Sequence, residues 1–330
     1  MKRYVNFTFS IFIIITMALT PLGCTNKTPD NKVVIFSAAE EQRLAYILGR
    51  LQERFPDYEI VMEFVPTGTI ASRIAAEGAD ILCDIVHEFD YGFAATSEPH
   101  FADLSSWYDF NRFTDDAVLP SKKMIPTLRG GACIAINEDL LATRGLPIPT
   151  SYQDLLDPIY RGLISMPSPV SSGTGFTFLY SLVRAWGEEA AFQYFDALSE
   201  NLLHFTTSGM GPINDLIAGE VAIGFAFLSQ AVMEVNNGLN VSLHFFEEGS
   251  PHAIYGMAII EGSQGNQAVK DVFDYFYETL IEDSNALFSP EKTFRDIDFV
   301  MDNYPVNIPY SDMTGNSPEE RDRLLAKWEH

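Results

Sequence analysis

The sequence predicts an α/β protein with two lobes and a ligand cleft between them. Three observations support this fold class. Strand-like and helix-like segments alternate from residue 32 onward, the alternation restarts after a strand-like segment at 130–141, and an apolar run at 253–263 has the pattern of a strand leading back. A chain of 330 residues is long enough for two such units joined by crossing strands.

The first unit has the order strand, helix, strand, helix, strand. Residues 32–38 are a β-branched run that ends in small side chains, and 40–56 carry apolar side chains at helical spacing up to Pro56. The segments 58–66, 67–78 and 79–89 follow as a strand, a turn with a short helix, and a third strand. Parallel sheets place ligand loops at the carboxyl ends of their strands, which are here 37–39, 67–69 and 87–88.

A second unit begins with the strand-like segment 160–169 and the loop "SPVSSGTG". Residues 204–219 then combine a loop and a helix, and 220–227 form another apolar strand. After the returning strand, 266–281 has the pattern of an amphipathic helix. The helical spacing of 321–330 predicts a last helix that packs on the second lobe.

The N-terminus has the features of a secretion signal. Lys2 and Arg3 precede an apolar segment of signal-peptide length that is short for a membrane span. Gly23-Cys24 is similar to a bacterial lipoprotein processing site, although Pro21-Leu22 departs from the usual residues. We therefore predict a signal peptide over 1–23, lipidation of Cys24, a polar tether over 24–32 and an exported, membrane-anchored protein; simple secretion is the alternative.

The charge of the chain limits its partners. There are 21 Lys and Arg against 45 Asp and Glu, a net charge of -24, which repels nucleic acid and anionic membrane surfaces. We therefore predict no nucleic-acid partner.

Cys83 and Cys133 lie in apolar strand-like runs, and either a disulfide or two buried thiols fits them. The lack of a CxxC or Cys/His pairing gives no support for a zinc site.

Several segments carry a resemblance to one family. They are "VVIFSAAEE", "YRGLISMPSPVSSGTG", "SGMGPINDLIAGEVAIGFAF", "YGMAIIEGSQGNQAVKDVFDYF" and "YPVN". In their order and spacing the chain resembles type 2 periplasmic binding proteins of ABC importers, in the branch that binds ferric ion, thiamine, phosphonates and sugar phosphates. The resemblance implies a monomer without a cofactor, whose two lobes close over one small ligand and dock on a membrane permease.

The resemblance also implies where the lobes and the hinge lie. The first lobe comprises 33–133 and 253–290, and the second comprises 134–252 and 291–330. The hinge is expected near 130–136 on the way out and near 253–258 on the way back.

Iron is disfavoured as the ligand. Ferric binders of this family use a His and a Glu of the first lobe and two adjacent tyrosines of the second, because Fe³⁺ requires anionic oxygen ligands. Here Phe225, Ala226 and Phe227 stand near the tyrosine positions, and no histidine follows the first strand. We predict no metal site, and a ferric-ion-binding protein with Glu88 near the carboxylate position is the alternative.

Three loops rich in small hydrogen-bond donors precede predicted helices, at 67–69, 171–174 and 207–211. Helix N-termini bind oxyanions through free N–H groups and the helix dipole, so we predict a cage for an organic anion such as a sugar phosphate or a phosphonate. Ordinary N-caps and turns are the alternative. The predicted ligand-binding residues are Ser37, Ala38, Thr67, Gly68, Thr69, Glu88, Ser171, Ser172, Gly173, Thr174, Ser208, Gly209, Phe225 and Tyr255.

The aromatic side chains among these are expected to stack on a ring or carbon chain of the ligand, with core packing as the alternative for Phe225. Glu88 is expected to receive hydroxyl groups or an amine. No GxSxG, HExxH or GxxxxGK[ST] motif occurs, so we predict no catalytic residues and no enzyme activity. The sequence thus predicts the substrate-binding lipoprotein of an ABC importer, with a surface lipoprotein without a transport role as another alternative.

Overall fold

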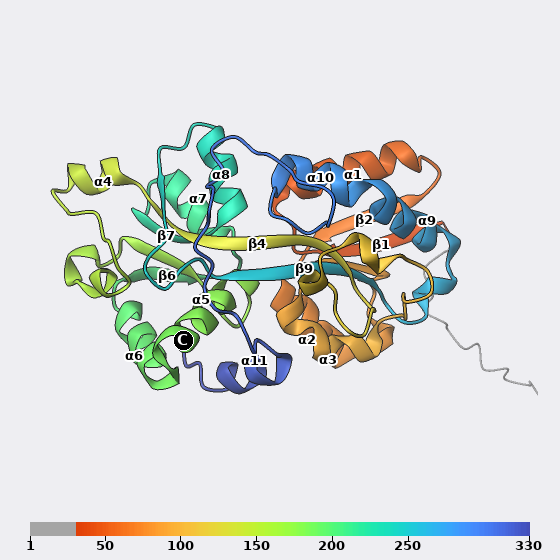
Figure 1. The fold of residues 1–330 in the computed structure, drawn as a ribbon, viewed down its shortest axis with the longest axis horizontal. Helices are drawn as coiled ribbons and strands as arrows, with labels where there is room; N and C mark the ends of the chain where they lie inside the picture. The colour runs from red at the N-terminus through yellow and green to blue at the C-terminus, as the bar shows by residue number, and fades with distance from the viewer. Residues whose placement is uncertain (1–30) are drawn as a thin grey trace, which may run out of the picture.

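The computed structural model describes residues 31–330 and has two lobes side by side (Figure 1). The predicted signal peptide and Cys24 lie outside the described residues. Two long strands, β4 (Ile125–Ile136) and β9 (His252–Ile259), run from one lobe into the other. The two-lobed α/β fold predicted from the sequence is confirmed.

The first lobe has parallel strands covered by helices on both faces. Its strands are β1 (Lys32–Ser37), β2 (Glu59–Phe64) and β3 (Ile85–Asp90), with β1 in the middle. Helices α1 (Glu41–Arg54), α9 (Gln267–Tyr275) and α10 (Ile281–Phe288) cover one face, and α2 (Thr67–Glu77) and α3 (Ala94–Ser97) cover the other (Figure 1). Burial on both faces explains the apolar run Val33 to Phe36 of β1, whereas β3 is buried along its whole length although it carries His87, Glu88 and Asp90.

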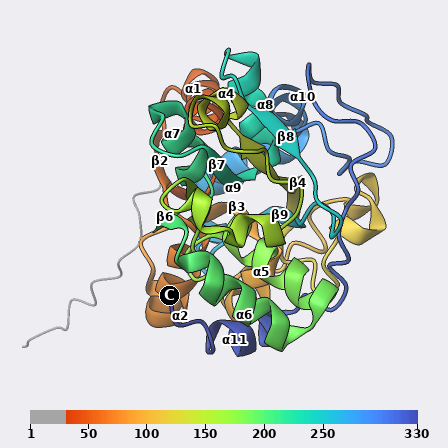
Figure 2. The ribbon, with the colours of Figure 1, turned by 90° about the vertical axis from the view of Figure 1, so that its left-hand side faces the viewer.

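The second lobe repeats this layering, as Figure 2 shows from its end. Its strands β5 (Ile164–Pro167), β6 (Leu202–Thr206) and β7 (Ile223–Phe227) are parallel, with β5 in the middle. Helices α5 (Gly173–Trp186) and α6 (Glu188–Ser199) cover one face, and α7 (Gly211–Ala218) and α8 (Leu228–Asn236) cover the other. The short elements α4 (Glu138–Thr143) and β8 (Ser242–His244) complete this lobe.

Strands β4 and β9 join the two lobes into one mixed sheet. Strand β4 pairs with β9 over 125–131 and with β7 over 132–136, so it changes neighbours at Gly131. The sheet order is β2-β1-β3-β9-β4-β7-β5-β6, with β8 on β4. The residues predicted as a hinge belong to these two strands, and hinge motion there stays a prediction.

Two predicted strands have different bounds in the structure, and β4 begins earlier than predicted, at Ile125. Strand β3 begins only at Ile85, because a turn and Asp84 precede it. Strand β4 ends at Ile136, because the Asn137 side chain accepts a hydrogen bond from the N–H of Leu140 at 2.9 Å and starts α4.

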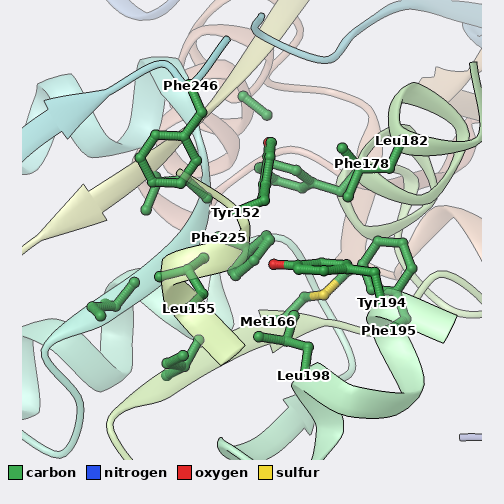
Figure 3. Packing of buried hydrophobic residues seen from close by; sticks show 14 of the residues in the cluster. Tyr152, Leu155, Met166, Phe178, Leu182, Tyr194, Phe195, Leu198, Phe225 and Phe246 are labelled. Carbon is green, nitrogen blue, oxygen red and sulfur yellow. The ribbon is translucent and has the colours of Figure 1, made fainter. Parts of the chain in front are cut away.

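Aromatic side chains fill the core of the second lobe between the sheet and helices α5 and α6 (Figure 3). The ring of Phe225 packs edge-on against Phe178, with centroids 4.9 Å apart, and Tyr152 packs edge-on against Phe246 at 5.0 Å. Edge-to-face pairs of this kind add about 0.5–1.5 kcal/mol each to the apolar area that they bury. The pair of Phe225 and Phe178 packs β7 against α5.

Helix α11 (Pro318–Leu325) contacts both lobes. Leu324 belongs to the core of the second lobe, as predicted for this segment, whereas the buried Arg321 lies over Phe93 of the first lobe. The Nη2 of Arg321 donates to the carbonyl of Pro169 at 3.1 Å. The C-terminal segment is thus a bridge between the lobes.

Candidate functional site

The carboxyl ends of the parallel strands in both lobes face one cavity of about 60 Å³. Such a volume holds only a small molecule. The cavity is lined by Ala38, Glu40, Phe64, Pro66, Thr67, Glu88, Leu128, Ser171, Ser172, Gly173, Thr174, Ser208, Gly209, Met210, Phe227, Gln230 and Tyr255. This is the place that the topology of open α/β sheets favours for a ligand, because loops of both lobes converge there.

The structure brings together ten of the fourteen predicted ligand-binding residues at this cavity. They are Ala38, Thr67, Glu88, Ser171, Ser172, Gly173, Thr174, Ser208, Gly209 and Tyr255. They come from loops, helix starts and strands that together span more than 200 residues of the chain, from Ala38 to Tyr255. The loop after each strand and the start of the next helix account for most of them.

The other four predicted residues do not line the cavity. Ser37 is buried, with its Oγ 3.0 Å from Nδ1 of His87, and Thr69 is exposed. Gly68 packs against the backbone of Val170 and Ser171, where a Cβ would lie 2.6 Å from the Val170 carbonyl oxygen. Ser37, Gly68 and Thr69 therefore lie behind or outside the residues that line the cavity.

The stacking role predicted for Phe225 is wrong, because this ring lies in the core of the second lobe and is fully buried. Phe227, two residues further along β7, lines the cavity instead. Its ring packs edge-on against Tyr255, with centroids 5.8 Å apart. Residues of β7 reach the cavity only where the strand ends.

Five helices of eight or more residues begin at the cavity wall. Lining residues stand at the starts of α1 (Glu40), α2 (Thr67), α5 (Gly173), α7 (Met210) and α8 (Phe227). Each N-terminus carries free N–H groups and the positive end of a helix dipole. No Lys, Arg or His is among the described residues that line the cavity, so the backbone provides its positive potential.

Two adjacent serines have different roles in this wall. The Oγ of Ser172 accepts a hydrogen bond from the N–H of Gly175 at 3.3 Å and caps α5. The Oγ of Ser171 is buried and has no hydrogen-bond partner. A buried hydroxyl without a partner is costly, so the Ser171 side chain is the one in this loop that needs a ligand group.

Close backbone approach explains two glycines of the wall. A Cβ on Gly209 would lie 2.5 Å from Oγ1 of Thr174, and a Cβ on Gly173 would collide with Oδ2 of Asp90 from the first lobe. Any side chain at either position would enter the cavity wall or push the lobes apart. Glycine is therefore required by the packing.

Two carboxylates form the opposite wall. Glu88 lies in a bulge of β3 with a φ of 51°, and Glu40 stands at the start of α1. Nε of Arg43 contacts Oε1 of Glu88 at 2.5 Å, whereas Oε1 of Glu40 has no hydrogen-bond partner. A bulge redirects the side chain that it carries, which explains how Glu88 faces the cavity from a buried strand.

Burial controls the ionisation of this wall. It raises the pKa of Glu88 to about 8 and raises that of Glu40, while Arg43 lowers both. Because the two carboxyl groups interact, they titrate as a pair. Burial also raises the pKa of Tyr255 far above its usual range, so its hydroxyl stays neutral next to Thr174.

The sequence interpretation missed Glu40, Gln230 and Arg43. Glu40 belongs to an acidic pair before a helix, a pattern that usually compensates a helix dipole at the surface. Gln230 lies in the buried first half of α8 next to Ser229, and its buried Oε1 has no partner. Arg43 is almost fully buried in a helix whose other charged residues are exposed or half-buried. The only sequence signal for Gln230 and Arg43 is a polar residue on a helix face that is otherwise apolar.

Cys83, Cys133 and His87 are buried and do not line the cavity. Cys83 and Cys133 are buried free thiols in different hydrophobic clusters, which decides between the two alternatives for them. His87 is buried against Phe276, and burial lowers its pKa well below the usual range.

Within residues 31–330, no helix has both the length and the hydropathy of a membrane span.

Comparison with known proteins agrees with this architecture. Residues 78–283, more than half of the chain, match the model of the family described as "Bacterial extracellular solute-binding protein". An uncharacterized protein of Haemophilus influenzae is 26% identical over 66% of this chain and 65% of its own length. The phosphoglycerate transport regulatory protein PgtC of Salmonella typhimurium is 24% identical over 62% of this chain and 54% of its own length. The chain thus spans less than two thirds of the length of these relatives.

Solved structures share the fold at low sequence identity. The periplasmic binding protein AfuA of Actinobacillus pleuropneumoniae, solved with fructose-6-phosphate bound, has a TM-score of 0.76 at 20% identity and covers 90% of this chain and 97% of its own. Iron-bound HitA of Pseudomonas aeruginosa has a TM-score of 0.72 at 16% identity and covers 90% of this chain and 98% of its own. Proteins of one fold thus hold chemically different ligands. On the family match, the chain belongs to the bacterial extracellular solute-binding proteins and has the type 2 periplasmic binding protein fold.

Proposed function

We propose that the protein is the substrate-binding component of an ABC import system and captures a small organic anion, a sugar phosphate or a phosphonate, between its lobes. It then delivers this ligand to the membrane permease of the system, as a monomer. The family match supports the transport role. The names of two similar proteins, one solved with fructose-6-phosphate and one named for phosphoglycerate transport, favour a phosphate-containing ligand.

The observation that carries the proposal is the start of α5. Ser171 has a buried hydroxyl without a partner, directly before a helix N-terminus that faces the cavity. The N-termini of α2 and α7 face the same space. An oxyanion placed there receives backbone N–H groups and hydroxyls in a site without cationic side chains. This arrangement suits a protein with a net charge of -24.

The test compares the two adjacent serines. Ser171→Ala removes the free hydroxyl and is expected to weaken binding of glucose 6-phosphate roughly 10- to 100-fold, because a hydrogen bond to a charged group contributes about 1.5–3 kcal/mol. Ser172→Ala removes the cap of α5 and is expected to lower stability by about 1 kcal/mol. Calorimetric titration and urea denaturation of both variants separate the two effects.

A neutral sugar provides the control. If glucose binds the wild-type protein as tightly as glucose 6-phosphate does, the oxyanion site is refuted. Equal affinity of wild type and Ser171→Ala for the phosphate also contradicts the proposal. In either case the loop at 171–174 is only a structural cap.

We further propose that the protein is anchored by a lipid on Cys24, which would hold it near its permease. Wild-type protein is expected to partition into a detergent phase, and Cys24→Ala is expected to release it into the aqueous phase. Mass spectrometry of the mature N-terminus identifies the modified residue. Aqueous partition of the wild type would refute the anchor without affecting the binding proposal.

A further inference from the structure

We infer that the ligand carries a protonated amine in addition to its oxyanion, and that Glu40 and Glu88 bind this amine. The inference rests on the proposed function, because the amine would occupy the same cavity as the anion. It goes further by assigning a zwitterionic class of ligand. The argument depends on charge and on unpartnered acceptors.

The charges of the cavity are unsuited to a ligand that is only an anion. Two carboxylates line the wall, and the described lining residues include no cation. Arg43 lies behind the wall and contacts Glu88 at 2.5 Å. Its Nη2 is held by Ser284 at 3.1 Å and by Asn285 at 2.8 Å, so Arg43 balances one carboxylate and stays in place. Burial favours the neutral acid for a second group without its own cation, and a positive charge brought by the ligand would stabilise it as a carboxylate.

The buried acceptors match an ammonium group. Oε1 of Glu40 and Oε1 of Gln230 are buried without hydrogen-bond partners, and the two residues are only 8% and 5% exposed. With the carboxylate of Glu88 they offer three acceptor groups from α1, α8 and β3. An ammonium group donates three hydrogen bonds and brings the missing charge, whereas a hydroxyl group donates one and brings none.

The other titratable groups near this wall do not replace the amine. Burial keeps His87 neutral, and its Nδ1 faces Ser37 rather than the cavity. Asp90 is acidic, and the hydroxyl of Tyr255 contacts Thr174 on the anion side. The donors of α5 and α7 belong to the second lobe, and the two carboxylates belong to the first. A small zwitterion therefore contacts both lobes at once with opposite charges.

The experiment uses pairs of phosphates that differ in one group. Calorimetric titration of the full mature protein compares phosphoethanolamine with ethyl phosphate and 2-hydroxyethyl phosphate, and glucosamine 6-phosphate with glucose 6-phosphate. The amine is expected to improve affinity on the order of 10- to 100-fold in at least one pair. Glu40→Gln is expected to reduce this preference to less than threefold. Glu41→Gln, which makes the same change at an exposed neighbour, is expected to leave it intact.

Proton release gives a second readout on the wild-type protein, so the test does not depend on the folding of a variant. An ammonium group favours ionised carboxylates, so phosphoethanolamine should release protons, seen as different binding enthalpies in two buffers of different ionisation enthalpy. Ethyl phosphate should release fewer. If the amine analogues bind no better than their partners, the inference is overturned while the anion site stands. If none of the phosphates binds, the proposed function itself is overturned.

Discussion

Replacing Arg43 by Met tests whether the carboxylate wall depends on one buried cation. Arg43 is 1% exposed and contacts Glu88, Ser284 and Asn285. Methionine fills much of the same volume but leaves two buried carboxyl groups without a cation. Removing one partner of a buried ion pair costs about 3–5 kcal/mol, so the free energy of unfolding should fall by this amount above pH 8, where Glu88 is ionised in the wild type.

A double-mutant cycle and the pH dependence of the unfolding free energy identify the cause of this loss of stability. Adding Glu88→Gln to Arg43→Met should recover on the order of 1–3 kcal/mol, because the remaining buried charge is reduced. The loss caused by Arg43→Met should be smaller at pH 5 than at pH 8, since the carboxyl groups are then protonated in the variant. Urea denaturation followed by circular dichroism measures all three proteins.

A surface ion pair provides the matched control. Arg73 pairs with Glu77 at 3.1 Å on α2, and both side chains are about one third exposed. Arg73→Met should therefore cost less than about 1 kcal/mol. If Arg43→Met costs no more than Arg73→Met, the buried cation does not stabilise the wall and the reasoning fails.

Two further predictions concern the cavity. Gly209→Val should abolish binding of glucose 6-phosphate in calorimetric titration with an unchanged circular dichroism spectrum, because its Cβ would lie 2.5 Å from Oγ1 of Thr174; retained affinity would contradict the assigned wall. Burial raises the pKa of Glu88 from 4.5 to about 8, so this group stabilises the fold at low pH and the contribution is lost as pH rises to about 8. The unfolding free energy of the wild type should therefore fall more between pH 5 and pH 8 than that of Glu88→Gln. Parallel pH profiles of the two proteins would contradict the raised pKa of Glu88.

The starts of α2, α5 and α7 could be predicted from the sequence because their signals are local. Glycine, serine and threonine before an apolar run mark the starts of α2, α5 and α7. Parallel strands then place these starts at one edge of a sheet. The anion side of the cavity follows from these two rules.

The acidic side was predicted only in part, because Glu88 was expected at the cavity but Glu40 and Arg43 were not. The contact between Glu88 and Arg43 depends on a bulge in β3 and on residues of α10 that are more than 240 positions from Arg43. Phe225 and Phe227 are two residues apart on β7, so the sequence pattern does not distinguish them. Only Phe227 reaches the cavity, because it stands at the end of the strand. Arg321 likewise crosses to the first lobe through tertiary packing, which periodicity does not report.

The position of β9 determines the order in which the lobes can be completed during synthesis. This strand lies between β3 and β4, and its residues 252–259 are made after all strands of the second lobe. Until they emerge, β3 has an unpaired edge, and an open edge is prone to pair with other chains. The sheet of the second lobe is contiguous in the chain and can form first. The lobe that begins the chain is therefore the one whose sheet is finished last.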